Sequence, residues 1–213
     1  LTLKENRIYG LLGKNGMGKS TLLYLIAGLL RPKNGNVCVD GMESKDRRPE
    51  MLREIYVVPE EYNLPNLTLK QYVKVHQDFY PRFSEEILMN CLRDFEMQAD
   101  VNFKHLSMGQ KKKIYMSFAV ASCCQLLLMD EPTNGLDIPS KALFRKVIAG
   151  NLPADSSLII STHQVHDVEQ LLDHVFILNN SEMIIDASVE EIAKQYEFTY
   201  RNANEMGEDV LYA

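Results

Sequence analysis

Short apolar runs recur near both ends of the chain, and each has the length of a buried strand. The first, Arg-Ile-Tyr-Gly-Leu-Leu at 7–12, stops at a glycine-rich loop. Comparable runs occupy 37–39, 55–58, 126–129, 158–161, 175–178 and 183–185. Most of these runs lack polar alternation, which is typical of strands covered on both faces of a sheet. The pattern therefore predicts a sheet whose strands are mostly buried.

Longer stretches with helical character lie between these runs. An almost continuously apolar stretch at 20–30 predicts a helix buried against the sheet. Further helices are expected near 139–149, where Pro139 falls in the first turn, and near 164–172. A capping box at Ser188 predicts a last short helix. Strands that alternate with helices in this way indicate an α/β fold.

The middle of the chain differs, because helix signals dominate there. Thr68 and Ser107 are suitable N-caps for two helices. Ser84, followed by two glutamates, predicts a third helix, since acidic residues favour the positive end of the helix dipole. We therefore expect a helical subdomain at 62–121, inserted into an α/β core that is formed by 1–61 and 122–213.

Composition constrains location and partners. Of the 213 residues, 46% are hydrophobic and 24% are charged, as in globular domains that bury a core. The net charge of −6 argues against a general nucleic-acid binder, so no nucleic-acid partner is expected. The longest strongly apolar run, 22–30, is far shorter than the about 20 residues that cross a bilayer. No metal-ligand spacing relates the cysteines, which favours reduced, mostly buried thiols in the cytoplasm; they are Cys38, Cys91, Cys123 and Cys124.

The glycine-rich loop at 13–20 matches the eight-residue P-loop pattern between a strand and a helix. Its glycines let backbone N–H groups point inward at phosphate, and the helix adds its positive end. Lys19 supplies a full positive charge to the phosphates, and Ser20 supplies a hydroxyl to Mg²⁺. The expected phosphate-binding residues are Gly13, Lys14, Asn15, Gly16, Met17, Gly18, Lys19, Ser20 and Thr21.

Two carboxylates end an apolar strand in the sequence Leu-Leu-Leu-Met-Asp-Glu-Pro at 126–132. A buried strand delivers its last residues to the same edge of the sheet as the P-loop. Asp130 is therefore a candidate Mg²⁺ ligand, and Glu131 can reach the water that attacks the γ-phosphate. An acidic pair alone would more often be a solvated loop, but together with a P-loop it favours a catalytic site.

Three further motifs resemble those of one family. Leu-Ser-Met-Gly-Gln at 106–110 resembles the signature of ATP-binding-cassette (ABC) ATPases, usually LSGGQ, with Met108 in place of the first glycine. Asn-Gly-Leu-Asp at 134–137 resembles the family's D-loop, and His163, after a strand, resembles its switch histidine. The resemblance covers essentially the whole chain.

The resemblance implies a P-loop NTPase with a RecA-like core, a mainly parallel sheet and a helical subdomain. It also implies that ATP is hydrolysed with Mg²⁺, with Glu131 as the base and His163 as a second catalytic residue. In the family, each ATP lies between the P-loop of one cassette and the signature of another, packed head to tail. A second cassette is therefore an expected partner, and its nucleotide would contact Ser107, Gly109, Gln110 and Asp137.

Two positions depart from the family pattern. A glutamine usually ends the strand before the helical insert, in the Q-loop, but here the matching residue is Glu60, with Glu61 as a second register. Glutamate can still reach Mg²⁺ or water, so Glu60 is a candidate metal ligand and catalytic acid. The family also stacks adenine on an aromatic residue upstream of the P-loop. Tyr9 is expected to face the core instead, and because the chain starts at Leu1 rather than Met, we expect the stacking residue to lie further upstream.

These features favour the ATPase of a transporter that has a separate integral membrane subunit. Such a cassette would be cytoplasmic and attached to the inner face of the membrane. The Tyr-Pro-Arg-Phe stretch at 80–83 weakly resembles bacterial drug- or peptide-export cassettes. The alternative is a soluble ABC ATPase that acts on ribosomes or DNA; the signature argues against a P-loop kinase or GTPase. The three lysines at 111–113 are expected on a solvated helix face.

Overall fold

The computed structural model describes residues 1–62 and 64–195. In this part of the chain, a six-stranded sheet has the order β4-β5-β6-β1-β7-β8. The strands are β1 (Ile8–Leu12), β4 (Ile55–Val58), β5 (Leu126–Asp130), β6 (Ser157–Thr162), β7 (His174–Asn179) and β8 (Glu182–Ser188). All neighbouring pairs are parallel except β7 and β8. The mainly parallel α/β fold predicted from the apolar runs is therefore confirmed.

One face of the sheet is covered by the helix that follows the P-loop. This helix, α1 (Lys19–Ile26), shares a buried core with α2 (Pro49–Leu52) and with the hairpin of β2 (Cys38–Val39) and β3 (Met42–Glu43). It is shorter than the predicted 20–30. Gly28 has a φ of 67°, and a Cβ at this position would lie 2.1 Å from the Ser44 carbonyl oxygen. The helix ends early because the chain makes this close, left-handed turn.

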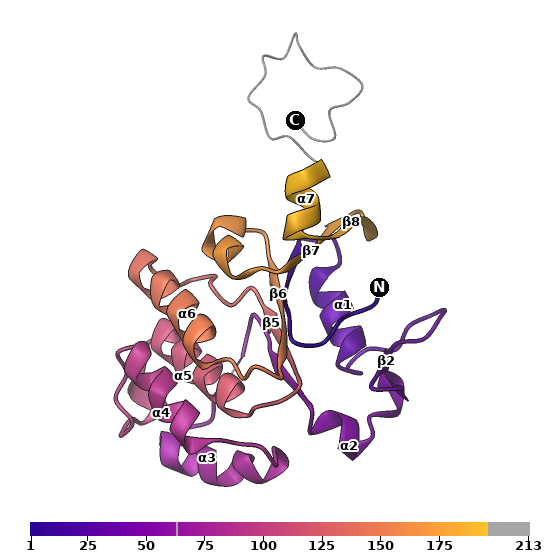
Figure 1. Cartoon of the computed structure of the whole chain (residues 1–213). Coiled ribbons are helices and arrows are strands. Elements are labelled where there is room, and N and C mark those ends of the chain that lie inside the picture. The colour runs from indigo at the N-terminus through magenta and orange to yellow at the C-terminus, as the bar shows by residue number, and fades with distance from the viewer. Residues whose placement is uncertain (63, 196–213) are drawn as a thin grey trace.

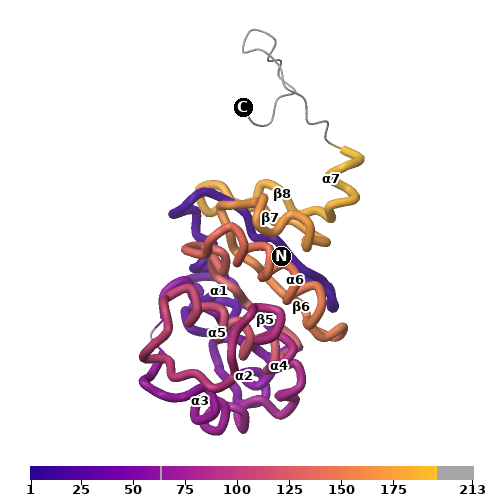
Figure 2. The backbone as a smooth tube through the Cα atoms, turned by 90° about the vertical axis from the view of Figure 1, so that its left-hand side faces the viewer, coloured from indigo at the N-terminus to yellow at the C-terminus, as the bar shows by residue number. Residues whose placement is uncertain are grey.

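The other face is covered by four helices, and Figure 1 shows α5 and α6 across the sheet from α1. They are α3 (Leu69–His76), α4 (Glu85–Asp94), α5 (Met108–Ala121) and α6 (Ile138–Asn151). The hydroxyls of Thr68, Ser84 and Ser107 each accept a backbone N–H of the first turn that follows. The three predicted N-caps are therefore confirmed. Figure 2 shows α3 and α4 at the opposite end of the molecule from β7 and β8.

Aromatic side chains join these helices to the sheet. The Phe118 ring in α5 lies 5.8 Å from that of Tyr56 in β4 and 5.1 Å from that of Tyr72 in α3, between ring centroids. Phe118 and Tyr56 belong to one continuous core with β5 residues such as Leu127. Burial of this apolar surface fixes α5 on the sheet and so sets the direction in which its first turn points.

The helical stretch predicted at 164–172 is not one continuous α-helix. Two short 3₁₀ helices, Val165–Asp167 and Glu169–Leu171, occupy this stretch. Val168 separates them with a φ of −131°, and its side chain is fully buried. Packing of this β-branched residue breaks the helix. The capping box at Ser188 is confirmed, since Ser188 and Glu191 exchange hydrogen bonds at the start of α7 (Val189–Gln195). Other 3₁₀ helices span Ser44–Asp46, Gln77–Phe79 and Phe103–His105.

The cysteines follow the expected pattern. All four are free, Cys38 is exposed and the other three are buried. Burial raises the pKa of the Cys91 and Cys124 thiols to about 12, so both are protonated and unreactive at neutral pH. Within residues 1–62 and 64–195, none of the helices is long and apolar enough to cross a membrane.

Candidate active site

The P-loop connects β1 to α1 in the way that phosphate binding requires. Gly13 has a φ of 154°, and a Cβ there would lie 2.5 Å from the Leu178 carbonyl oxygen. Gly18, with a φ of 96°, is the N-cap of α1 and offers no side chain to accept the first N–H groups of the helix. These N–H groups are therefore available to an anionic ligand. Ser20 and Thr21 follow in the first turn of α1.

Lys19 lies across the mouth of the P-loop. It is only 5% exposed, and its Nζ donates to the carbonyl oxygens of Gly13 at 2.8 Å and Lys14 at 3.2 Å. The same ammonium lies 3.3 Å from Oε1 of Glu131. The loop's own carbonyls thus fix the position of the positive charge.

Asp130 ends β5 and Glu131 follows it, one strand away from the P-loop strand β1, because β6 lies between β5 and β1. Asp130 is buried and pairs in register with Ser161 of β6, whose Oγ donates to Oδ1 of Asp130. Thr162, the next residue of β6, pairs with Leu12 at the end of β1. Because the strands are parallel, their carboxyl ends share one edge of the sheet. Asp130 therefore faces the same edge as Ser20.

Glu131 contacts both the P-loop lysine and the predicted switch histidine. Its side chain is buried, and Oε1 lies 3.0 Å from Nδ1 of His163 as well as 3.3 Å from Nζ of Lys19. Its backbone has a φ of 45°, in the left-handed region that residues other than glycine seldom occupy. The Glu131 N–H donates to the Ser161 carbonyl oxygen at 3.0 Å. Lys19, Glu131 and His163 therefore form one contiguous cluster.

Glu60 lies at the same edge but makes a different contact. Its Oε1 accepts a hydrogen bond from Nδ2 of Asn134 at 2.8 Å. Asn134 begins the predicted D-loop, and Asp137 ends it as the N-cap of α6, accepting the Ser140 N–H at 2.9 Å. The hydrogen bonds from Ser140 hold the pKa of Asp137 below its ordinary value, so this carboxylate is charged at neutral pH. The Q-loop and D-loop positions are thus in direct contact.

The signature sequence lies at the start of α5. Ser107 Oγ accepts the Gln110 N–H at 3.2 Å, and Gln110 Oε1 accepts the Ser107 N–H at 2.9 Å. Gln110 therefore completes a capping box. Met108, between Ser107 and Gly109, is 64% exposed. At Gly109, an added Cβ would meet only Leu136 at an ordinary 3.8 Å, so the fold of a single chain does not itself require glycine there.

Comparison with known proteins decides the family. The family model described as ABC transporter matches residues 1–134. The chain belongs to the ABC transporter family. The resemblance carried by the P-loop, the signature and the acidic strand end is therefore confirmed, and ATP binding, which defines these cassettes, follows from family membership.

Relatives of this ABC protein extend the match over most of the chain. The ABC transporter ATP-binding protein YtrB of Bacillus subtilis is 27% identical over 198 residues, which cover 92% of this chain and 68% of YtrB. The SkfA peptide export ATP-binding protein SkfE of the same organism is 26% identical over 213 residues, covering 97% of this chain and 88% of SkfE. The dimeric structure of a bacterial ABC transporter cassette superposes with a TM-score of 0.76 at 24% identity, covering 89% of this chain and 88% of that one.

Lys112 is a residue of this ABC protein's site that the sequence analysis missed. The prediction of a solvated helix face at 111–113 is wrong for Lys112, which is only 6% exposed. Its Nζ donates to the carbonyl oxygens of Glu131 at 2.8 Å and Asn134 at 2.9 Å. Burial lowers the pKa of Lys112, while the carboxylates of Glu60, Glu131 and Asp130 act in the opposite direction. The burial of Lys112 could have been predicted from its spacing to the buried Met116, since residues four apart in a helix share a face.

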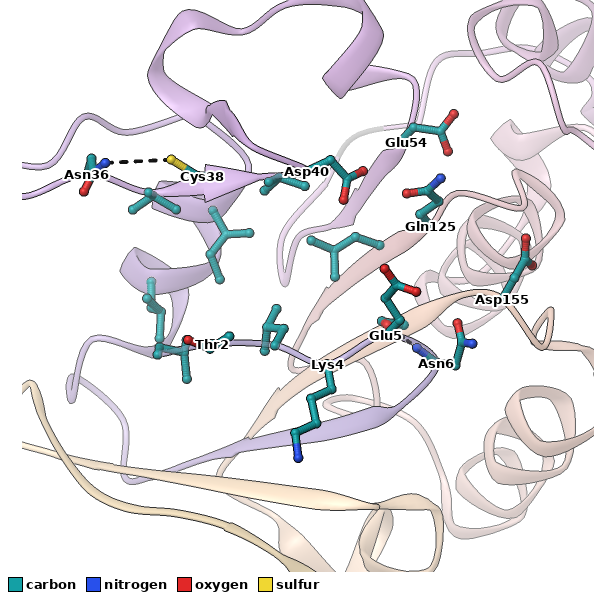
Figure 3. A pocket seen from close by; sticks show the side chains of 18 residues that line it. Thr2, Lys4, Glu5, Asn6, Asn36, Cys38, Asp40, Glu54, Gln125 and Asp155 are labelled. Carbon is teal, nitrogen blue, oxygen red and sulfur yellow. Dashed lines mark hydrogen bonds between the residues drawn. The ribbon is translucent and has the colours of Figure 1, made fainter.

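A cavity of about 720 Å³ lies apart from the P-loop of this ABC protein. Figure 3 shows the N-terminal residues Lys4 and Glu5 on one side of it and Asn36, Cys38 and Asp40 on the other. Residues 13–20 and the Glu131 cluster do not line it. Its volume does not make it the candidate active site, because the P-loop glycines and the carboxylates of Asp130 and Glu131 do not line it.

Proposed function

We propose that this chain binds ATP with Mg²⁺ and hydrolyses it as the cassette subunit of a transporter, an exporter in particular. The observation that supports this most directly is the cluster around Glu131, with contacts of 3.3 Å to Lys19 and 3.0 Å to His163. These three groups can bind a phosphate, activate a water and hold the activating carboxylate. The peptide-export name of SkfE favours the direction of transport that we propose.

The residues present fit both ATP and its metal ion. Asp130 is a buried carboxylate at the edge of the sheet where the P-loop lies, with Ser161 donating to one of its oxygens, and it can hold Mg²⁺ together with Ser20. The metal ion would neutralise charge on the phosphate oxygens. The P-loop N–H groups and Lys19 bind the β- and γ-phosphates, and Lys19 then exchanges its contact with Glu131 for one with phosphate.

That exchange would leave Glu131 with His163. A carboxylate released from an ammonium ion is a stronger base, because the opposite charge no longer stabilises its ionised form. Glu131 would accept a proton from the attacking water, and His163, donating from Nδ1, would keep the carboxylate oriented. Binding of ATP thus prepares the base that hydrolyses it.

The exposed signature supports a site completed by a second cassette. Ser107 and Gly109 begin α5 on the opposite face of the sheet from α1, and the first turn of a helix favours anions. In our proposal the signature of one chain faces the γ-phosphate held by another. A separate membrane subunit would then use the opening that follows hydrolysis, which would place the chain on the cytoplasmic side of a membrane.

The proposal predicts dimerisation that depends on ATP. The Glu131→Gln variant, which retains ATP, is expected to be monomeric without nucleotide and dimeric with saturating Mg-ATP, because ATP supplies part of the interface. Sedimentation or light scattering measures the change in mass. The matched control adds Gly109→Asp to the Glu131→Gln variant. This substitution brings a negative charge toward the γ-phosphate and should disrupt the dimer. A Glu131→Gln chain that stays monomeric with ATP bound contradicts the sandwich.

A second prediction concerns the Q-loop acid. Glu60→Gln preserves the size of the side chain and can still accept from Asn134 through Oε1, but it removes one negative charge near the phosphates. We expect turnover within a few-fold of the parent and unchanged or tighter binding of Mg-ATP, since a repulsion is removed. ATPase rate against ATP concentration measures both quantities. A loss of turnover like that of a catalytic base would instead make Glu60 the catalytic acid.

The transporter role is tested separately from the chemistry. Purification of the tagged chain from membranes of its own cells is expected to recover an integral membrane protein with several spans. Recovery of ribosomes or DNA instead would favour the soluble class of ABC ATPase. Absence of ATP hydrolysis by the purified recovered complex would contradict the enzymatic part of the proposal.

A further inference from the structure

Lys112 combines deep burial with an unusual pair of acceptors. Its ammonium group, on the second turn of α5, donates to two backbone carbonyl oxygens, those of Glu131 and Asn134. Burial of an ammonium ion is costly unless its hydrogen bonds are made, and an apolar side chain of the same length would avoid the cost. The role of Lys112 therefore lies in its hydrogen bonds to these two carbonyl oxygens.

These two carbonyls mark the ends of a short turn that carries the proposed base. The Asn134 N–H donates to the Glu131 carbonyl oxygen at 3.1 Å, so residues 131–134 form a closed turn. Glu131 itself adopts a φ of 45°. A side chain in that left-handed conformation is disfavoured, and it persists only where the surroundings hold the backbone.

The surroundings hold Glu131 from two sides. Its N–H is bound by the carbonyl oxygen of Ser161 in β6, and its carbonyl oxygen is bound by Lys112 from α5. The turn's own hydrogen bond already supplies one donor to this carbonyl, so Lys112 adds a second donor whose direction is set by another helix. The second bond of Lys112, to Asn134, fixes the far end of the same turn.

We propose that Lys112 is a positioning residue that holds the backbone of Glu131 in its left-handed conformation and thereby aims the carboxylate at the attacking water. This inference rests on the proposed function of Glu131 as the base. Because Ser107 and Lys112 lie on the same helix, α5 also connects the signature to the base. Movement of the signature onto a nucleotide would be transmitted to Glu131 through the side chain of Lys112.

Replacement of Lys112 tests whether this residue positions Glu131, which would change kcat, or contributes to ATP binding, which would change the Kd. Lys112→Met keeps an unbranched side chain and removes both hydrogen bonds. We expect kcat to fall by about 10- to 100-fold, since a displacement of about 1 Å in a catalytic group has effects of that order. The Kd for ATP should stay within about threefold of the parent, because the P-loop is untouched. Lys112→Gln retains a donor and should recover part of kcat.

The matched control is Lys111→Met, which removes a lysine from the same helical turn at a partly exposed position. Its kcat is expected to lie within about twofold of the parent. Melting temperatures of all variants show whether the fold is kept. If Lys112→Met does not fold, Lys112→Gln is compared with the parent instead, and if neither folds, Lys112 serves stability and the proposal is wrong.

A double-mutant cycle with Glu131→Gln shows whether Lys112 acts through the base. If it does, Lys112→Met adds less than about twofold to the loss already caused by Glu131→Gln. A full additional 10- to 100-fold loss in that background, or an unchanged kcat for Lys112→Met in the parent, overturns the inference. Failure of the parent itself to hydrolyse ATP would count against the proposed function, which the cycle thus distinguishes from a failure of Lys112.

Discussion

Glu131→Gln is expected to lower the turnover number for ATP by about 10²- to 10⁴-fold, the usual worth of a positioned general base. The substitution keeps the shape of the side chain and an oxygen that can accept from His163, whose Nδ1 lies 3.0 Å from Oε1 in the parent. It removes the carboxylate that, in the proposed mechanism, takes the proton from water. It also removes a negative charge that lies 3.3 Å from Lys19. Affinity for ATP should therefore be retained or improved.

The comparison with Glu60→Gln makes this prediction specific. Both substitutions remove one carboxylate at the same edge of the sheet, but Glu131 follows a buried strand, whereas Glu60 begins an exposed loop and contacts Asn134. Turnover and ATP affinity are to be measured for both variants in one preparation with the membrane partner. An inactive Glu60→Gln beside an active Glu131→Gln would show that the base is Glu60.

An element of this structure can be predicted from the sequence when the residues that determine it are close together in the chain. The P-loop and the helix caps at Thr68, Ser84 and Ser107 follow from adjacent residues, and the structure has them where the sequence indicated. The early end of α1 does not, because it depends on the approach of Gly28 to the distant Ser44 carbonyl. A pattern read along one segment does not contain that contact.

The burial of Lys112 in the candidate site also depends on a contact that is distant in the sequence. Three consecutive lysines after the signature indicate a solvated helix, and the burial of the middle one depends on the turn at 131–134 that packs against it. The left-handed backbone of Glu131 is likewise set by its neighbours in space rather than by its own preference. The residues of the candidate site could thus be named from their types and order, whereas the way in which Glu131 is held could not.

Lys19→Ala is expected to weaken ATP binding by a factor on the order of 10² or more, the range found when one partner of a buried charge pair is removed. Lys19 is the cation that the structure fixes at the mouth of the P-loop, through the carbonyl oxygens of Gly13 and Lys14. The N–H groups of the loop and of α1 would still meet the phosphates, but as partial charges. Without a full charge they cannot offset the desolvation of the phosphate oxygens.

The same substitution also leaves Glu131 without its ammonium partner, at the place where the proposed mechanism puts the γ-phosphate. Repulsion between this carboxylate and the phosphate would add to the loss, so Lys19→Ala combined with Glu131→Gln should bind ATP more tightly than Lys19→Ala alone. Titration calorimetry with Mg-ATP measures both variants. Lys33→Ala, which removes an exposed lysine after α1, controls for the change in net charge. An ATP affinity of Lys19→Ala equal to that of Lys33→Ala would mean that 13–20 is not the phosphate site.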